Sequence, residues 1–249
     1  MEGVWAHTYS IVGRCERSGE LGVAVASAVP AVGAICPYLR PGIGAVSTQS
    51  WVNPYLAVAV LDRLATGAEA PEAVGTVLAD DPAASVRQLG AIAARGPGAA
   101  FTGTDCTPAC GHKTAADHAV QGNMLTGVDL LEAMSQAFSA VPAAALDLRL
   151  LTALEAGQAT GGDKRGRQSA ALVVMGAEVY PRVDLRVDDH HDPIAELRRI
   201  HSIAAQQLAP FVAGMPRRDG PASAAPAHVT EMLLRPPPER PGGGGSERP

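Results

Sequence analysis

The order of strand-like and helix-like segments along the chain constrains its fold more than any other feature of the sequence. Strand patterns come in runs and helix patterns follow them, so that the two kinds do not alternate one by one. Strict alternation is typical of parallel sheets with crossover helices, whereas grouped runs are typical of helices layered on antiparallel sheets. The grouping therefore predicts an α+β domain with largely antiparallel sheets. We find no internal repeat.

The strands are predicted from short runs in which β-branched residues recur at every second position and turn residues mark the ends. The polar stretch 14–20 separates the first two runs, which predicts a hairpin. A later run, 169–175, is almost continuously apolar and is typical of a buried strand. Strands are expected at 7–13, 21–27, 43–49, 89–93, 99–102, 118–122, 169–175 and 183–187.

The helices are predicted where apolar residues recur at intervals of three and four. Proline at position 71 fits the first turn of a helix, and the Asp192-Pro193 pair fits the N-cap and first position of the last one. Helices are expected at 55–64, 71–78, 128–138, 142–156 and 193–208.

Composition indicates that most of the chain can fold. Of its 249 residues, 47% are hydrophobic and 18% are charged, which provides enough apolar surface for a core. The formal charge of -5 argues against a nucleic-acid-binding protein, because such proteins need a basic face. No apolar run approaches the roughly 20 residues that span a bilayer, and the first residues do not resemble an export signal. We therefore expect a cytoplasmic protein that binds neither nucleic acid nor membranes.

Glycine and proline are concentrated at the end of the chain, where 214–249 contains eight of the 20 prolines. Such a composition predicts a disordered tail that does not join the core. We expect residues 8–213 to form one layered domain, preceded by an extension, 1–7. The sequence does not determine the oligomeric state, although a domain rich in alanine and poor in aromatic residues could bury one flat helical face in a homodimer.

The motifs of several enzyme classes are absent: the chain has no Gly-x-Ser-x-Gly elbow, no P-loop and no His-Glu-x-x-His zinc pattern. A hydroxyl-bearing strand stands instead near its start, where Thr8 and Ser10 share one face and Tyr9 lies on the other. A threonine that begins a strand suggests an N-terminal nucleophile, whose own α-amine accepts the hydroxyl proton once the preceding residue is removed. The alternative is that Thr8 and Ser10 are ordinary strand residues.

Several segments together resemble one bacterial family of unknown function, whose members are described as N-terminal nucleophile (Ntn) hydrolase superfamily proteins. The similar segments are 8–12, 21–27, 32–34, 42–49, 120–125, 161–172 and 183–190, in order over about residues 8 to 200. The resemblance implies a four-layer αββα sandwich of the Ntn-hydrolase type, with Thr8 as nucleophile after processing. It says little about the substrate.

The chain departs from the family pattern at two places. Seven residues precede Thr8, so an enzyme requires self-cleavage after His7, trimming by another protease, or a different start. Cys110 stands near the place where the family carries a tryptophan before a Gly-His pair, here Gly111-His112, so the pocket is expected to differ in shape.

Hydrolysis of an amide also requires donors for the developing oxyanion and groups that orient the nucleophile. Asn123, after Gly122 at a strand end, suits the first task, although it could simply shape a turn. Asp163, Arg165 and Arg167 lie in a glycine-rich loop before a buried strand and suit the second, or the binding of a substrate carboxylate; the alternative is a solvated charged loop.

Further candidates for substrate binding are Ser10, Gln49, Asn53 and His112, with Gly122 and Arg165. The alternative for Gln49 and Asn53 is an ordinary loop. The Asp and His residues of 188–192, and the set Cys106, Cys110 and His112, lack the paired spacing of a metal site, so neither a metal nor a cofactor is expected.

These patterns lead to one hypothesis and two alternatives. The leading hypothesis is an Ntn-type amidohydrolase that cleaves an amide or related C–N bond of a small-molecule or peptide substrate. Thr8 is its nucleophile, and Asn123, Asp163 and Arg167 complete the catalytic set. The first alternative is a binding or accessory protein that keeps the fold without turnover. The second makes Ser10 the reactive hydroxyl.

Overall fold

The computed structural model describes residues 8–220 and 224–234. The extension 1–7 and the segments 221–223 and 235–249 of the predicted tail lie outside the described residues. The chain divides into two compact units, Met1–Arg198 and Arg199–Pro249, which we describe separately.

The larger sheet of the first unit has six strands in the order β10-β9-β2-β1-β8-β7, and every neighbouring pair is antiparallel. The hairpin predicted at the start of the chain is present, with Thr8 opposite Ser27 and Arg14 opposite Leu21. β1 therefore lies inside the sheet, between β2 and β8. The strands are β1 (Thr8–Arg14), β2 (Leu21–Ser27), β7 (Gly111–Thr114), β8 (His118–Gly122), β9 (Ser169–Met175) and β10 (Pro181–Val187).

The smaller sheet has four antiparallel strands in the order β3-β4-β5-β6. Its strands are β3 (Pro37–Arg40), β4 (Gly44–Ser50), β5 (Arg87–Ala93) and β6 (Ala99–Thr102). Both β4 and β5 are buried along their whole length, because one side faces helices and the other faces the six-stranded sheet. The predicted α+β class with antiparallel sheets is confirmed.

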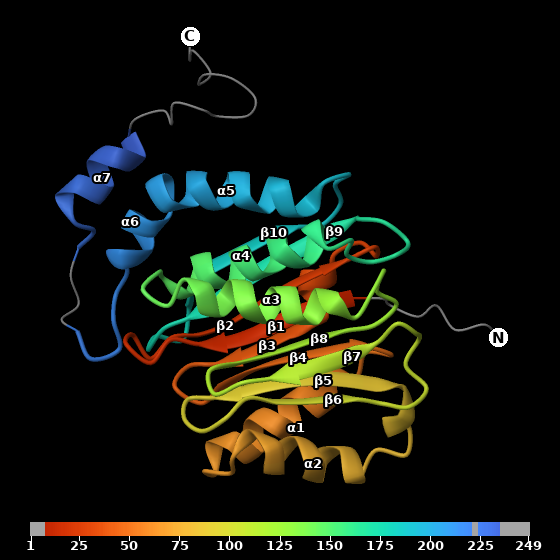
Figure 1. Cartoon of the computed structure of the whole chain (residues 1–249). Helices are drawn as coiled ribbons and strands as arrows, with labels where there is room; N and C mark the ends of the chain where they lie inside the picture. Colours follow the sequence, from red (N-terminus) through yellow and green to blue (C-terminus); the bar gives the residue numbers. More distant parts are fainter. Residues whose placement is uncertain (1–7, 221–223, 235–249) are drawn as a thin grey trace. The chain divides into compact units, whose positions relative to one another are not determined.

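Helices cover the outer face of each sheet (Figure 1). The helices α1 (Pro54–Ala65) and α2 (Ala70–Ala79) pack on the four-stranded sheet, and α3 (Asp129–Ala140) and α4 (Leu146–Ala159) pack on the six-stranded one. The two sheets face each other, so the first unit has the layer order helix, sheet, sheet, helix. Two short 3-10 turns, Val32–Ala34 and Ala84–Val86, complete it.

The space between the sheets is apolar at one end and polar at the other. At the apolar end Val12 of β1 packs in a cluster with side chains of β2, β4, β5 and β8. At the other end Ser10 Oγ donates a hydrogen bond to Gln49 Oε1 of β4, while the Tyr9 hydroxyl points the opposite way and donates to Gln158 Oε1 of α4. The alternation predicted along β1 is therefore confirmed, and it carries Thr8 and Ser10 into the space between the sheets.

The second unit contains the end of α5 (Pro193–Gln207), then α6 (Ala209–Ala213) and α7 (Ala227–Leu234). A Cβ on Gly214, after α6, would contact Pro226 and Val229, so the two short helices lie close together. α7 falls within the stretch that we predict to be a tail. The domain limits taken from the sequence stay predictions.

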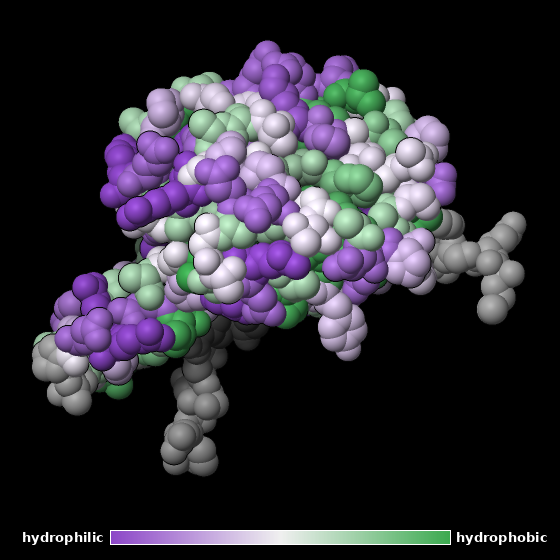
Figure 2. Space-filling view, turned by 90° about the horizontal axis from the view of Figure 1, so that it is seen from below, coloured by the Kyte–Doolittle hydropathy of each residue, from purple (hydrophilic) through white to green (hydrophobic). Residues whose placement is uncertain are grey.

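The outer face of the first unit on the side of α1 and α2 mixes hydrophilic and hydrophobic residues (Figure 2). Tyr55 and Val58 of α1 are exposed there. The predicted homodimer stays a prediction, and this helical face is one candidate for it. None of the helices within the described ranges combines the length and hydropathy that a membrane span requires.

Candidate active site

Thr8 is the first residue of β1. Its side chain is completely buried, and hydrogen bonds hold the residue on several sides. Its Oγ1 donates a hydrogen bond to Ser27 Oγ, 3.2 Å away on β2. Its carbonyl oxygen accepts from the main-chain N–H of Asn123 at 3.1 Å and from Gln49 Nε2 at 3.0 Å. Two strands of its own sheet and one of the opposite sheet thus fix the position of this residue.

Side-chain amides form a buried network next to Thr8. Gln121 Nε2 donates to Ser10 Oγ at 2.5 Å, and Ser10 Oγ donates to Gln49 Oε1 at 2.6 Å. Gln88 Oε1 of β5 accepts from Gln49 Nε2 and from Asn123 Nδ2, both at 2.8 Å. All five side chains are almost fully buried, so these hydrogen bonds are shielded from water.

Three buried oxygen atoms at this end of the inter-sheet space have no hydrogen-bond partner among the described residues: Asn123 Oδ1, Gln121 Oε1 and Ser47 Oγ. Buried polar atoms in proteins are usually paired with protein groups or with ordered water. The site therefore has acceptor capacity that a water molecule or a polar ligand can use.

The loop after α4 closes the same end of the sheet. Asp163 Oδ2 accepts from the main-chain N–H of Ala28, which directly follows β2, at 3.2 Å, and from Arg165 Nη2 at 2.9 Å. Asp163 also forms an isolated bridge with Leu125, just after β8. The side chain of Asp163 is buried and that of Arg165 is about 30% exposed, so this ion pair pins the loop beside the start of β1.

Arg167, a further charged residue of this loop, has a different partner. Arg167 Nη1 lies 3.2 Å from Asp192 Oδ2, and both side chains are partly exposed. Burial raises the pKa of Tyr9 far above its usual range, while the charge of Arg167 lowers this pKa and that of Asp163 raises it. The loop charges therefore reach the helix-facing side of β1, where the Tyr9 hydroxyl lies.

Two of the predicted substrate-binding residues lie apart from Thr8. Asn53 Oδ1 accepts the main-chain N–H of Tyr55 at 3.1 Å and so caps α1. His112 Nδ1 of β7 lies 2.9 Å from Thr102 Oγ1, and burial lowers the pKa of His112. Gly122 is close to the site, since its carbonyl oxygen accepts from Gln88 Nε2 at 2.9 Å.

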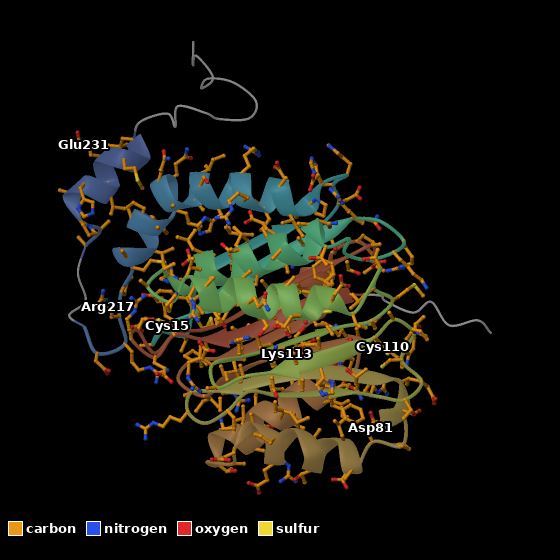
Figure 3. The ribbon with its side chains drawn as sticks, viewed as in Figure 1. Cys15, Asp81, Cys110, Lys113, Arg217 and Glu231 are labelled. Carbon is orange, nitrogen blue, oxygen red and sulfur yellow. The ribbon has the colours of Figure 1, made fainter. Side chains whose placement is uncertain are left out.

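Two free cysteines, Cys106 and Cys110, precede β7 and lie near the site. Cys106 Sγ donates to the carbonyl oxygen of Arg87, next to Gln88, at 3.3 Å. Cys110, in the loop before β7, is partly exposed (Figure 3). Burial raises the pKa of both thiols, which disfavours the reactive thiolate. Among the residues that the structure describes, no group of three or more His, Cys, Asp or Glu side chains is gathered to hold a metal ion.

Sequence reasoning missed four polar residues that line the site: Ser27, Ser47, Gln88 and Gln121. Each occupies a strand position that faces the other sheet or the side chain of Thr8. A signal was available for two of them, because Ser47 lies two residues from Gln49 on one face of β4, and Gln121 lies two residues before Asn123, which directly follows β8.

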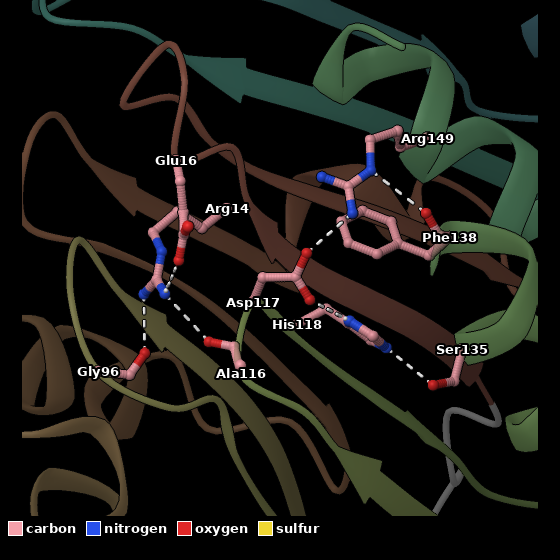
Figure 4. Close-up of polar contacts among 9 residues, drawn as sticks. All are labelled: Arg14, Glu16, Gly96, Ala116, Asp117, His118, Ser135, Phe138 and Arg149. Atoms are coloured by element: carbon pink, nitrogen blue, oxygen red, sulfur yellow. Dashed lines mark hydrogen bonds and ion pairs between the residues drawn. The ribbon is translucent and has the colours of Figure 1, made fainter. Parts of the chain in front are cut away.

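A second buried polar cluster joins β8 to α3 and α4 (Figure 4). His118 Nδ1 lies 2.8 Å from Asp117 Oδ1, and His118 Nε2 lies 2.8 Å from Ser135 Oγ. This order of groups is that of a serine hydrolase triad, but His118 is 1% and Ser135 is 5% exposed, so a substrate carbonyl has no path to the hydroxyl. Arg149 also pairs with Asp117, at 2.8 Å, and lies over the ring of Phe138. We assign this cluster a structural role.

The layers and the buried polar site define the class of protein: an α+β sandwich of two antiparallel sheets with a hydroxyl and amide site between them. Within that class, the chain belongs to the family of unknown function DUF1028, whose model matches residues 8–197. A crystal structure of a Silicibacter pomeroyi protein of the same family is similar, with 32% identity, a TM-score of 0.75, and coverage of 82% of this chain and 91% of that chain.

More distant solved structures are two Anbu (ancestral beta-subunit) proteins. The one from Yersinia bercovieri is 12% identical with a TM-score of 0.40 and covers 84% of this chain and 98% of its own. The one from Hyphomicrobium sp. strain MC1, a Gly-1 mutant, is 13% identical with a TM-score of 0.37 and covers 84% of this chain and all of its own. A search of curated proteins gives no match.

Proposed function

We propose that the chain is an Ntn-type amidohydrolase with the αββα fold of that class, and that Thr8 is its nucleophile once the His7–Thr8 bond is cut. The substrate is a small-molecule or peptide amide, or a compound with a related C–N bond. The chemistry requires no cofactor, because one residue supplies both the nucleophile and the base.

The observation that carries the proposal is the position of Thr8. It is the first residue of a strand inside the larger sheet, its hydroxyl faces inward, and its carbonyl oxygen is held by Gln49 and Asn123. A nucleophile needs a fixed position relative to its oxyanion donors. The buried amides beside Thr8 meet this need at the point in the chain where a new α-amine would form.

In this proposal the bond before Thr8 is cut in two chemical steps, formation of an ester on Thr8 and its hydrolysis. Thr8 Oγ1 attacks the carbonyl carbon of His7, the bond from that carbon to the Thr8 nitrogen breaks, and the nitrogen takes up the hydroxyl proton. The resulting ester on Oγ1 is hydrolysed by water, which releases residues 1–7 with a new carboxylate at His7. Thr8 is left with a free α-amine whose ordinary pKa of about 8 keeps it partly neutral at neutral pH.

Turnover uses the same atoms. The α-amine takes the proton from Oγ1, which attacks the substrate carbonyl, the C–N bond breaks, and the leaving amine receives that proton; water then hydrolyses the acyl ester. Asn123 Nδ2 donates one N–H to Gln88 Oε1. Its second N–H is directed at the Thr8 carbonyl oxygen over a long distance of 3.5 Å. We assign this second N–H to the oxyanion.

The remaining candidates take positioning and binding roles in the proposal. The ion pair of Asp163 with Arg165 orients the loop beside Thr8, and Arg167, which pairs with Asp192, is partly exposed. The residues proposed for substrate binding next to Thr8 are Ser10, Gln49, Gly122 and Arg165, whereas Asn53 caps α1 and His112 contacts Thr102.

Intact mass spectrometry of the purified full chain tests the proposal. We expect a species that begins at Thr8 in the wild type and only the uncut chain in Thr8→Ala. A Ser10→Ala control addresses the other hydroxyl, and a β-lactone probe should label the processed wild type at Thr8. A wild-type chain that stays whole and unlabelled in active cell extract refutes the proposal.

A non-catalytic binding protein is the second candidate. It is favoured by the hydrogen bond from Thr8 Oγ1 to Ser27 and by the complete burial of Thr8, which are also what a structural threonine requires. In that case Thr8→Ala lowers stability but changes neither the mass of the product nor any labelling.

A further inference from the structure

We propose that Gln88 is the positioning residue of the Thr8 site: its side-chain amide fixes both groups that hold Thr8. This inference rests on the proposed function and adds to it a residue of the opposite sheet that touches neither substrate nor nucleophile.

Gln88 is fully buried at the polar end of the inter-sheet space, and its side chain makes five hydrogen bonds. Its Oε1 accepts from Gln49 Nε2 and from Asn123 Nδ2, both at 2.8 Å. Its Nε2 lies 2.8 Å from Thr102 Oγ1, 2.9 Å from the carbonyl oxygen of Gly122 and 3.1 Å from that of Gly111. One side chain of β5 is thereby tied to β4, β6, β7 and β8.

The two bonds to Oε1 determine the orientation of the groups around Thr8. Gln49 Nε2 reaches both Gln88 and the Thr8 carbonyl, so its amide plane is set from two sides. Asn123 gives one N–H to Gln88, which leaves the second directed toward Thr8. Without an acceptor at Gln88, Gln49 loses one of its partners and Asn123 Nδ2 keeps only its long contact with the Thr8 carbonyl, so the oxyanion donor loses its fixed direction.

The bonds from Nε2 explain why an amide is required at this position. Carbonyl oxygens of Gly111 and Gly122 demand a donor, while Gln49 and Asn123 demand an acceptor. A carboxylate offers acceptors only, and a thioether of similar size offers neither at full strength. A protonated carboxyl, with one O–H and one carbonyl oxygen, comes closest to the amide.

The experiment compares wild type, Gln88→Met, Gln88→Glu and the control Gln136→Met, which changes an exposed glutamine of α3. Each full chain is followed by intact mass for the rate of cleavage before Thr8, and then by β-lactone labelling. Rates are taken from pH 5 to 8 and divided by the wild-type rate at the same pH. This division removes the titration of the new α-amine and of His112, which is joined to Gln88 through Thr102.

We expect Gln88→Met to cut roughly 100-fold more slowly than wild type, the effect of a misplacement of about 1 Å, and Gln136→Met to match wild type. At pH values where circular dichroism shows the variant to be folded, the relative rate of Gln88→Glu should rise as the pH falls and the introduced carboxyl takes up a proton, which is a rescue that a purely structural loss would not show. If Gln88→Met does not fold, the pH dependence of Gln88→Glu decides.

Each contrary result has a distinct meaning. Wild-type rates in both Gln88 variants overturn this inference and leave the proposed function standing. Slow cleavage by Gln88→Glu at a constant fraction of wild type across the pH range also overturns it, because the defect then lies in folding or packing. A wild-type chain that is neither cut nor labelled overturns both proposals.

Discussion

Gly90 of β5 allows the two sheets to approach closely where the amide network lies. A Cβ at this position would be 2.0 Å from Gln121 Oε1, 2.4 Å from its Cδ and 2.5 Å from its Nε2. Gly90→Ala therefore drives the buried side chain of Gln121 away from β5. Because Gln121 Nε2 donates to Ser10 Oγ, the displacement also breaks a hydrogen bond inside the network.

The size of the effect follows from these contacts. Overpacking of a well-packed interior costs about 1–3 kcal/mol, and the lost buried hydrogen bond adds about 1 kcal/mol. We expect Gly90→Ala to lower the free energy of unfolding by about 2–4 kcal/mol. For a unit of this size each kcal/mol corresponds to about 2–4 °C, so the Tm should fall by about 5–15 °C.

Urea unfolding monitored by circular dichroism measures the change, with two companion variants. Gly75→Ala lies in the middle of α2, where an added Cβ meets nothing within 4 Å, and should raise stability by about 0.5–1 kcal/mol. In the double variant Gly90→Ala with Gln121→Ala the steric conflict is gone, so the two losses should not add. Additive losses, or a Gly90→Ala midpoint equal to that of wild type, would refute the reasoning.

Two further predictions concern groups whose pKa is shifted. Hydrogen bonds, first from His118 and then from Arg149, hold the pKa of Asp117 down at about 2; its stabilising effect is complete above its ordinary range near pH 4 and is lost as the pH falls through 2. Since Asp117 is partly exposed, Asp117→Asn should cost only about 1 kcal/mol at pH 5 and little at pH 2 in urea unfolding, and an equal cost at both pH values would contradict this. Burial raises the pKa of Cys36 to about 12, so mass spectrometry should find this thiol unalkylated at pH 8 in the native protein and modified in urea; rapid native modification would show that Cys36 is accessible.

Alternating apolar residues and turn residues were enough to predict most strands of the fold, but two strands were not predicted. β3 (Pro37–Arg40) begins with proline and is only four residues long, and β7 (Gly111–Thr114) is a half-exposed edge strand with polar side chains. Edge strands bury little, so their sequences carry a weak pattern. The helix expected from Pro142 begins instead at Leu146, because residues 142–145 form a turn whose carbonyls accept from Arg17.

The site was predictable only in part, for a physical reason. The alternation of side chains along β1 places Thr8 and Ser10 on one face, and this can be inferred directly from the sequence. Gln88 meets Asn123 only because two sheets stack, and no local pattern records which residues face each other across that space. Charged loop residues are likewise ambiguous: Asp163 and Arg165 satisfy one another, a pairing that composition alone does not reveal.

The strand order of the larger sheet also limits when the proposed cleavage before Thr8 can occur during synthesis. β1 and β2 are close in the sequence, but the other neighbour of β1 is β8, which begins only at His118. At a synthesis rate of about 5–20 residues per second, roughly 5–20 seconds pass between the emergence of β2 and that of β8. Until β8 is made, β1 with Thr8 lies at an open edge of the sheet. Any cleavage that depends on its finished surroundings is a late event, and truncated chains should leave the ribosome with their first seven residues still attached.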